Sequence, residues 1–181
     1  MTLHFTSDSH FCDIRILNLQ KRPFASLAAH DDQLEQRWNE TVKPGDDVWH
    51  LGDFARGEPE KIAALLSRLH GHKHLLIGNN DPAHTAQLPG WVDVQHYTEL
   101  EVAGHKLVLC HYPFRSWNGD RRGSINLHGH SHGRLSPMAR QIDVGVDVWD
   151  FRPVTLDQLL AHPRGIPRPS PAAGGPPPEP A

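Results

Sequence analysis

The chain has 181 residues, a length that suits one domain with a sizeable apolar core. Its 38% hydrophobic and 22% charged residues are typical of a soluble globular protein, and no apolar run is long enough to span a membrane. The formal net charge of −3 argues against a protein dedicated to binding duplex nucleic acid, and two cysteines are too few for a disulfide framework. Since the N-terminus also lacks the pattern of a signal peptide, we expect a cytoplasmic protein with reduced thiols.

Strands and helices alternate in the first part of the predicted fold, and strands dominate the later part. Helices are expected at residues 31–42, from Pro59 to a stop at Gly71, and at residues 155–160. The expected strands lie at residues 3–5, 48–51, 74–77, 91–94, 100–102, 107–110, 125–128 and 142–148. This order favours a layered α/β or α+β domain rather than a helical bundle or a barrel.

The C-terminal part of the chain differs in composition from the rest. Residues 162–181 contain eight of the 16 prolines and few large apolar side chains. Such a segment cannot offset its ordering entropy by burial, so we expect a disordered Pro-rich tail after a folded domain at residues 1–161.

A group of polar side chains follows the expected strands at the points where the strands end. Because the carboxyl ends of parallel strands open onto a common crevice, side chains from distant parts of the sequence can meet there. Glycines beside several of them allow the sharp turn that a strand end requires. The candidate metal ligands are Asp8, His10, Asp53, Asn79, His111, His130 and His132.

These side chains offer two carboxylates, four imidazoles and one amide, which is too many ligands for one ion. An N/O ligand set without cysteine suits Mn²⁺, Fe, Zn²⁺ or Ni²⁺ at a reactive centre rather than a structural zinc site. We expect two divalent ions that share one carboxylate, with Mn²⁺ first among these metals. Such a pair clamps a phosphoryl group and lowers the pKa of a bridging water, which makes a hydroxide nucleophile near neutral pH.

Five short motifs resemble those of the calcineurin-like metallophosphoesterases, and they occur in the order of that family. The motifs are DSH at 8–10, LGD at 51–53, GNND at 78–81, CHYP at 110–113 and HGHSH at 128–132. The resemblance covers nearly all of residues 1–160, and it implies a four-layer α/β/β/α double β-sandwich with a dinuclear site. The later stretches DVGVD at 143–147 and RPV at 152–154 resemble small bacterial and phage members of the family.

The resemblance also assigns the ligands to two ions, with Asp53 as the bridge between them. Carried over by position, one ion would be held by Asp8, His10 and His132, and the other by Asn79, His111 and His130.

One position departs from the pattern of the family. The third motif usually reads Gly-Asn-His followed by an acidic residue, and its histidine binds the phosphate and assists the leaving group; here Asn80 takes that place. An amide can donate a hydrogen bond to phosphate but cannot supply a proton with a pKa near 7, which favours diesters over alkyl monoesters. The catalytic candidates are Asp53, Asn80 and Asp81, and the substrate-binding candidates are Asn80, Arg56 and Arg115.

The sequence therefore predicts a hydrolase of phosphodiester or similar phosphate bonds in a small molecule, a nucleotide or a nucleic-acid end. Two alternatives stay open: a phosphomonoesterase, such as a nucleotide or protein phosphatase, and a scaffold with this fold that binds proteins without catalysis. Retention of all the ligands of the family favours an enzyme over a scaffold. No membrane and no obligatory protein partner is expected.

Overall fold

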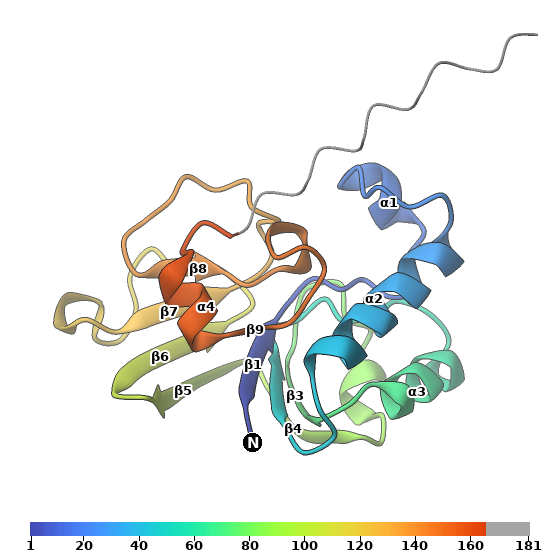
Figure 1. Ribbon diagram of the computed structural model, residues 1–181, viewed down its shortest axis with the longest axis horizontal. Helices are drawn as coiled ribbons and strands as arrows, with labels where there is room; N and C mark the ends of the chain where they lie inside the picture. The colour runs from blue at the N-terminus through green and yellow to red at the C-terminus, as the bar shows by residue number, and fades with distance from the viewer. Residues whose placement is uncertain (166–181) are drawn as a thin grey trace, which may run out of the picture.

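The computed structural model describes residues 1–165, and two β-sheets form its centre (Figure 1). The first sheet has the strand order β4 (Trp91–Gln95), β3 (His72–Leu76), β2 (Asp47–His50), β1 (Leu3–Thr6) and β9 (Val154–Thr155). Strands β1 to β4 are parallel, and β9 is antiparallel to β1. The second sheet has the order β5 (Tyr97–Val102), β6 (His105–Cys110), β7 (Ile125–His128) and β8 (Gln141–Asp143), and in it only β5 is antiparallel to its neighbour.

Short helical elements connect the strands. They are α1 (Arg15–Leu19), α2 (Leu27–Thr41), α3 (Pro59–Arg68), α4 (Leu156–Ala161) and the 3-10 turns η1 (Thr85–Gln87), η2 (Asp120–Arg122) and η3 (Val146–Val148). The Ser26 hydroxyl accepts a hydrogen bond from the Ala29 N–H at the start of α2. Pro59, which lacks an N–H group, occupies the first turn of α3, and Thr155 caps α4. Within residues 1–165, no helix has the length and apolar character needed to cross a membrane.

Two apolar clusters lie between the layers of the fold and hold them together. The cluster that joins the two sheets includes Phe5, Leu51, Leu76, Leu109 and Leu127. The cluster that joins the first sheet to α2 and α3 includes Leu34, Trp38, Ile62, Leu66 and Leu75. Neighbouring residues of β3, such as Leu75 and Leu76, fall in different clusters because side chains alternate across a strand. The predicted α/β domain with two layered sheets is therefore confirmed, and Figure 1 shows α2 and α3 beside the first sheet.

The two sheets come together at the carboxyl ends of β1 and β8. Ser7, directly after β1, pairs in parallel with Gly145, two residues beyond β8, and the Val146 N–H donates to the Ser7 carbonyl. All the parallel strands of both sheets therefore run in the same direction. The loops that follow β1, β2, β3, β6 and β7 consequently start from one end of the sandwich.

The differences from the predicted elements include the short strand β9, which was not expected, and two others. The strand expected at residues 142–148 is wrong beyond Asp143, because the Asp143 carboxylate accepts the Gly145 N–H and the chain turns into η3. Helix α1 was not predicted, since its five residues show no repeated apolar face and bury only Ile16. From residue 166 onward, the predicted Pro-rich tail lies outside the described residues.

Candidate metal centre

Five predicted ligands adopt left-handed backbone conformations, which residues other than glycine rarely occupy. They are Asp8 (φ 58°), His10 (φ 51°), Asp53 (φ 56°), His130 (φ 65°) and His132 (φ 48°). Each such residue costs of order 1–3 kcal/mol, and glycine would relieve the strain only by removing the ligand. Hydrogen bonds between the loops offset this cost: the Asp8 N–H donates to the Gly52 carbonyl, and the His10 N–H donates to the Asp53 carbonyl.

Asp8, His10 and His132, hereafter the Asp8 half-site, present ligand atoms that lie within 4.8 Å of one another. The rings of His10 and His132 stack with their centroids 5.4 Å apart. Asp8 and His10 are buried, and His10 Nε2 has no hydrogen-bond partner among the described residues. A buried imidazole nitrogen without a partner is costly, and a divalent ion in this cluster would satisfy it.

Asn79, His111 and His130, hereafter the Asn79 half-site, converge on one point from three loops. Asn79 Oδ1 lies 3.1 Å from His111 Nε2 and 2.9 Å from His130 Nδ1. Two donor atoms that each lie about 2.1 Å from one ion are about 3.0 Å apart when they subtend a right angle. Both distances from Asn79 Oδ1 therefore match the spacing of neighbouring ligands around a single ion.

Asp53 lies between the two half-sites. Its Oδ2 is 3.5 Å from His10 Nε2, and its Oδ1 is 3.6 Å from His111 Nε2. Each carboxylate oxygen thus faces one half-site, an arrangement that fits the predicted bridging role. Asp8 also lies within 4.8 Å of ligand atoms of Asp53 and His111, so the two half-sites adjoin.

Two glycines leave the space that the carboxylates occupy. A Cβ atom at Gly78 would clash with Asp53 Oδ1, and one at Gly129 would lie 2.6 Å from Asp8 Oδ2. Any larger residue at either position would push a carboxylate out of its place. The glycines of the GNND and HGHSH motifs are therefore needed for close approach.

Hydrogen bonds fix the ring orientation of two histidines. His111 Nδ1 donates to the Leu51 carbonyl at 2.8 Å, and His132 Nδ1 donates to Asp147 Oδ2 at 2.7 Å. Because a carbonyl or carboxylate oxygen only accepts, the proton of each ring lies on Nδ1. In both rings this leaves Nε2 as the nitrogen directed at the candidate centre, where it can bind an ion.

Burial lowers the pKa of the buried histidine ligands and acts to raise the pKa of the aspartate ligands. It lowers the pKa of His10 to about 3 and also lowers the pKa of His111, so both rings stay neutral near pH 7. Burial and the negative charges of Asp143 and Asp53 raise the pKa of Asp8 well above its usual value. Burial acts on Asp53 in the same sense, but His111 and the hydrogen bonds from Asn80 outweigh it, so the net change in the Asp53 pKa is a decrease.

Asn80 and Asp81, two of the predicted catalytic residues, both contact the loop of Asp53. The backbone N–H and the side-chain amide of Asn80 each donate to the Asp53 carboxylate at 2.7 Å. Asp81 Oδ2 accepts the N–H groups of Asp53 and Gly78, and Oδ1 accepts the N–H of Phe54. Burial raises the pKa of Asp81 to about 6. With both oxygens on backbone groups, Asp81 ties the loop after β2 to the loop after β3.

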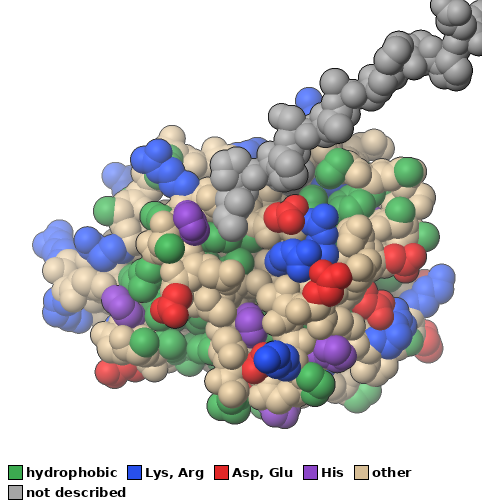
Figure 2. Space-filling model, viewed as in Figure 1, with side chains coloured by type: hydrophobic (Ala, Val, Ile, Leu, Met, Phe, Trp, Pro, Cys, Tyr) green, Lys and Arg blue, Asp and Glu red, His purple; other side chains and the backbone are tan. Residues whose placement is uncertain are grey.

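The predicted substrate-binding arginines lie on exposed loops. Arg56 follows Asp53 in the chain, and Arg115 lies in the loop between β6 and β7, where Arg121 and Arg122 are also exposed. Figure 2 shows basic side chains gathered at the end of the molecule where Figure 1 places this loop. A contact of Arg56 or Arg115 with substrate stays a prediction.

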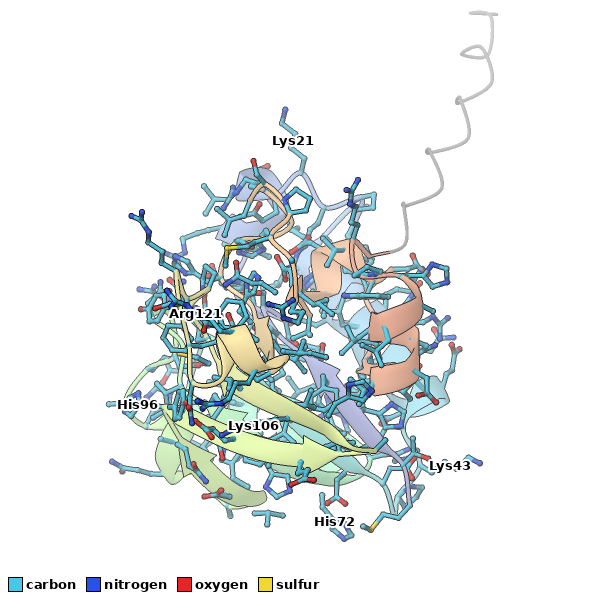
Figure 3. The ribbon with its side chains drawn as sticks, turned by 90° about the vertical axis from the view of Figure 1, so that its left-hand side faces the viewer. Lys21, Lys43, His72, His96, Lys106 and Arg121 are labelled. Atoms are coloured by element: carbon cyan, nitrogen blue, oxygen red, sulfur yellow. The ribbon has the colours of Figure 1, made fainter. Side chains whose placement is uncertain are left out.

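Three other histidines stand outside the predicted ligand set. His72 and His96 are exposed, and Figure 3 shows both at the edge of the molecule. His50 is buried, with its Nε2 2.7 Å from Ser9 Oγ and its ring stacked on Trp38. His50 is therefore a core histidine that packs behind the first loop.

Three polar residues outside the predicted set support the centre. Asp143 Oδ2 accepts hydrogen bonds from the Ser131 hydroxyl and the Gly133 N–H, which fixes the loop of the HGHSH motif. Arg22 forms a bidentate ion pair with Asp147, the carboxylate that orients a ligand ring. The two aspartates stand in the DVGVD stretch that the resemblance singled out, whereas Arg22 lies in a loop without a motif.

Known proteins resemble this chain in sequence and in fold. Residues 1–147 match the model of the calcineurin-like phosphoesterase superfamily domain. The gene 66 protein of Mycobacterium phage D29 is 32% identical, over 80% of this chain and 87% of that protein. An uncharacterised protein of Methanocaldococcus jannaschii is 28% identical, over 87% of this chain and 89% of that protein. A solved protein of unknown function from Aquifex aeolicus has a TM-score of 0.72 at 22% identity, covers 88% of this chain and 97% of its own, and shares the fold.

Proposed function

Because the chain belongs to the calcineurin-like phosphoesterase superfamily, we propose that it is a hydrolase with two divalent ions that cleaves phosphodiester or similar phosphate bonds. The observation that carries the proposal is the position of Asp53, whose two carboxylate oxygens face the two half-sites. Members of the family typically bind divalent metals, and the N/O donors of both half-sites suit such ions. Mn²⁺ is the ion that we expect.

The residues of the centre have separate roles in this proposal. When bound, the ions supply positive charge to the phosphoryl group and a nucleophilic water of lowered pKa. Asp53 sets the spacing of the half-sites, and His111 and His132 present Nε2 in directions fixed by their Nδ1 hydrogen bonds. Asn80 lies beside Asp53 and can turn its amide from that carboxylate to a phosphate oxygen.

The Asn80 amide favours substrates whose leaving group needs no added proton. General acid assistance contributes about 10²–10⁴-fold, and an amide cannot provide it. Alkyl monoesters lose this contribution, whereas diesters and anhydrides with acidic leaving groups do not need it. The exposed arginines of the loop between β6 and β7 suit an anionic substrate, such as a nucleotide or a nucleic-acid end.

Metal analysis and two chromogenic substrates test the proposal. Purified protein that is stripped by a chelator and reloaded with Mn²⁺ should bind two ions per chain. It should hydrolyse bis-p-nitrophenyl phosphate with a higher kcat/KM than p-nitrophenyl phosphate. A higher kcat/KM for the monoester would make the protein a phosphomonoesterase, and folded protein that binds no ion and hydrolyses neither substrate would be a scaffold.

A further inference from the structure

Arg22 has a fully buried guanidinium, with a side-chain exposure of 0%. A guanidinium carries five N–H donors and no acceptor, so its burial requires acceptors for all of them. Nε and Nη2 donate to the two carboxylate oxygens of Asp147, and Nη2 also donates to the Asp8 carbonyl. Nη1 donates to the Ser9 carbonyl and to His30 Nε2. Every donor of this guanidinium therefore has an acceptor.

Two of these hydrogen bonds hold the turn that carries the first two ligands of the Asp8 half-site. Nη2 of Arg22 lies 2.6 Å from the Asp8 carbonyl oxygen, and Nη1 lies 2.8 Å from the Ser9 carbonyl oxygen. Both carbonyls belong to the strained segment in which Asp8 and His10 have positive φ. By fixing these carbonyls, Arg22 keeps the two ligand side chains directed at one point.

The ion pair between Arg22 and Asp147 reaches the third ligand of the same half-site. The two bonds of the pair measure 3.1 Å and 2.7 Å, and the Asp147 side chain is only 3% exposed. Asp147 Oδ2 also accepts the Nδ1–H of His132 at 2.7 Å. A carboxylate held in this way fixes the plane of the imidazole that it contacts.

The guanidinium is itself held from the helical layer. His30, on α2, accepts a hydrogen bond from Nη1 of Arg22 at 2.8 Å, and its Nδ1 lies 2.7 Å from Asp31 Oδ1. The guanidinium carbon also lies 5.7 Å from the centroid of the Phe151 ring. These contacts connect the ligand loops to α2 and to the segment after η3, and they leave the guanidinium little freedom to move.

We propose that Arg22 is a positioning residue that preorganises the Asp8 half-site and has no comparable effect on the Asn79 half-site. Its guanidinium contacts the supports of all three ligands of the first half-site. The second half-site is fixed by other groups, among them the Asp81 carboxylate that holds the turn before Asn79. The inference rests on the proposed dinuclear function, because it concerns how tightly each ion binds.

Calorimetric titration of the metal-free protein with Mn²⁺ tests the inference. Loss of a group that orients metal ligands typically lowers affinity 10–100-fold, so Arg22→Gln should weaken one of the two ions by about that factor. The other ion should keep its affinity within about threefold. The half-sites are told apart in single-site backgrounds: Arg22→Gln should weaken the ion that remains in His111→Ala and leave unchanged the ion that remains in His10→Ala.

A surface arginine serves as the matched control. Arg68 forms the same bidentate pair with Glu35, both bonds measuring 2.7 Å, but its side chain is 54% exposed. Arg68→Gln should therefore leave the affinity for both ions unchanged. If Arg22→Gln does not fold, Arg22→Lys and Asp147→Asn test the same support, and circular dichroism of the metal-free proteins shows which variants are folded.

The outcomes separate this inference from the proposed function. In a folded variant, equal weakening of both ions, or no weakening of either, would overturn the role of Arg22. If the wild-type protein binds a single ion, the dinuclear proposal fails, and the same substitution still decides the inference. If that ion lies in the Asp8 half-site, so that His10→Ala abolishes its binding, weaker binding in Arg22→Gln would support the role of Arg22 and unchanged binding would overturn it. If it lies in the Asn79 half-site, weaker binding in Arg22→Gln would overturn the role.

Discussion

The Asp8 half-site and the Asn79 half-site use similar donors but differ in burial and in support. Two ligands of the Asp8 half-site are buried and the third is partly buried, whereas in the other half-site only His111 is buried and Asn79 and His130 are exposed. The buried half-site is supported by a buried ion pair. The exposed one is supported by a backbone carbonyl and by a carboxylate on neighbouring N–H groups.

The difference shows how burial and support go together in this fold. Buried charges are costly unless they are paired and hydrogen-bonded, so the buried carboxylate of Asp147, which contacts His132, needs a partner such as Arg22. The more exposed Asn79 half-site leaves two of its ligands, Asn79 and His130, accessible from solvent. We therefore expect the Asp8 half-site to bind its ion more tightly. The ion of the Asn79 half-site should be the one that contacts the substrate.

The largest effect is expected from the residue that both half-sites share. Asp53→Asn should lower kcat/KM for bis-p-nitrophenyl phosphate by about 10³-fold or more, because several kcal/mol of metal-dependent stabilisation is lost. Circular dichroism should show an intact fold. Asp32→Asn, on the exposed face of α2, is the matched control and should behave as wild type. Turnover near the wild-type rate in Asp53→Asn would contradict the site.

Substituting a ligand in one half-site at a time should show how the two half-sites differ in metal binding. His10→Ala and His111→Ala should each bind one Mn²⁺ and should each lose about 10²-fold or more in turnover. The two remaining ions should differ, because the one left in His111→Ala lies in the buried and better supported half-site. Its release to a chelator should be about tenfold slower. Equal release rates in stopped-flow measurements would mean that burial and support do not set how tightly each ion is held.

The sequence predicted the parts of the fold that have a repeated pattern. The apolar stripe of α3 and the short strands of both sheets follow from residue periodicity, and the structure contains them. The strand expected at residues 142–148 also has alternating apolar residues, yet it ends at Asp143. A side-chain hydrogen bond to the Gly145 N–H turns the chain there, and the alternating pattern contains no sign of that bond.

The ligand residues could be predicted because each motif is a short stretch of sequence. The residues that support the ligands could not be predicted, because they lie far from the ligands in the sequence. Arg22 lies 125 residues from Asp147 and 14 residues from Asp8 in the sequence. An isolated arginine in a loop predicts a solvated side chain, and only the packing of α2 against the ligand loops shows it to be buried. The individual roles of the ligands and of Asn80 stay predictions.

The pH at which each ion is lost should also distinguish the half-sites. Burial and nearby carboxylates raise the pKa of Asp8, so protons compete with its ion at a pH where an ordinary aspartate is already ionised. The pKa of His111 is lowered by burial, so protons compete less with the ion of the other half-site. Below the Asp8 pKa, affinity of the Asp8 half-site should fall about tenfold per pH unit.

Equilibrium dialysis with Mn²⁺ between pH 8 and pH 5 measures this order of loss. In the His111→Ala background the remaining ion should be lost at a higher pH than in the His10→Ala background. Because the pKa of His10 is lowered to about 3, protonation of that ring does not contribute in this range. Loss of the ion first in His10→Ala would contradict the assignment of the raised pKa to the Asp8 half-site.

The smallest effect is expected at Asn80, which donates two hydrogen bonds to the carboxylate that the half-sites share. Asn80→His places a titratable ring where the family usually has one. An imidazolium can bind a phosphate oxygen and protonate an alkoxide leaving group. The ratio of monoester to diester kcat/KM should therefore rise by about tenfold, a small part of the 10²–10⁴-fold that a well-placed general acid contributes.

The measurement compares an alkyl monoester with an aryl diester in wild type, Asn80→His and Asn80→Ala. Asn80→Ala removes the amide hydrogen bond to Asp53 without adding an acid, so it should change both activities in parallel. A ratio that rises with histidine but not with alanine isolates proton donation from altered hydrogen bonding. That rise should fade as the pH passes above the pKa of the new ring, because only the protonated imidazole is an acid. If the ratio does not change with either residue, Asn80 only shapes the loop around Asp53, and the preference for diesters loses its main support.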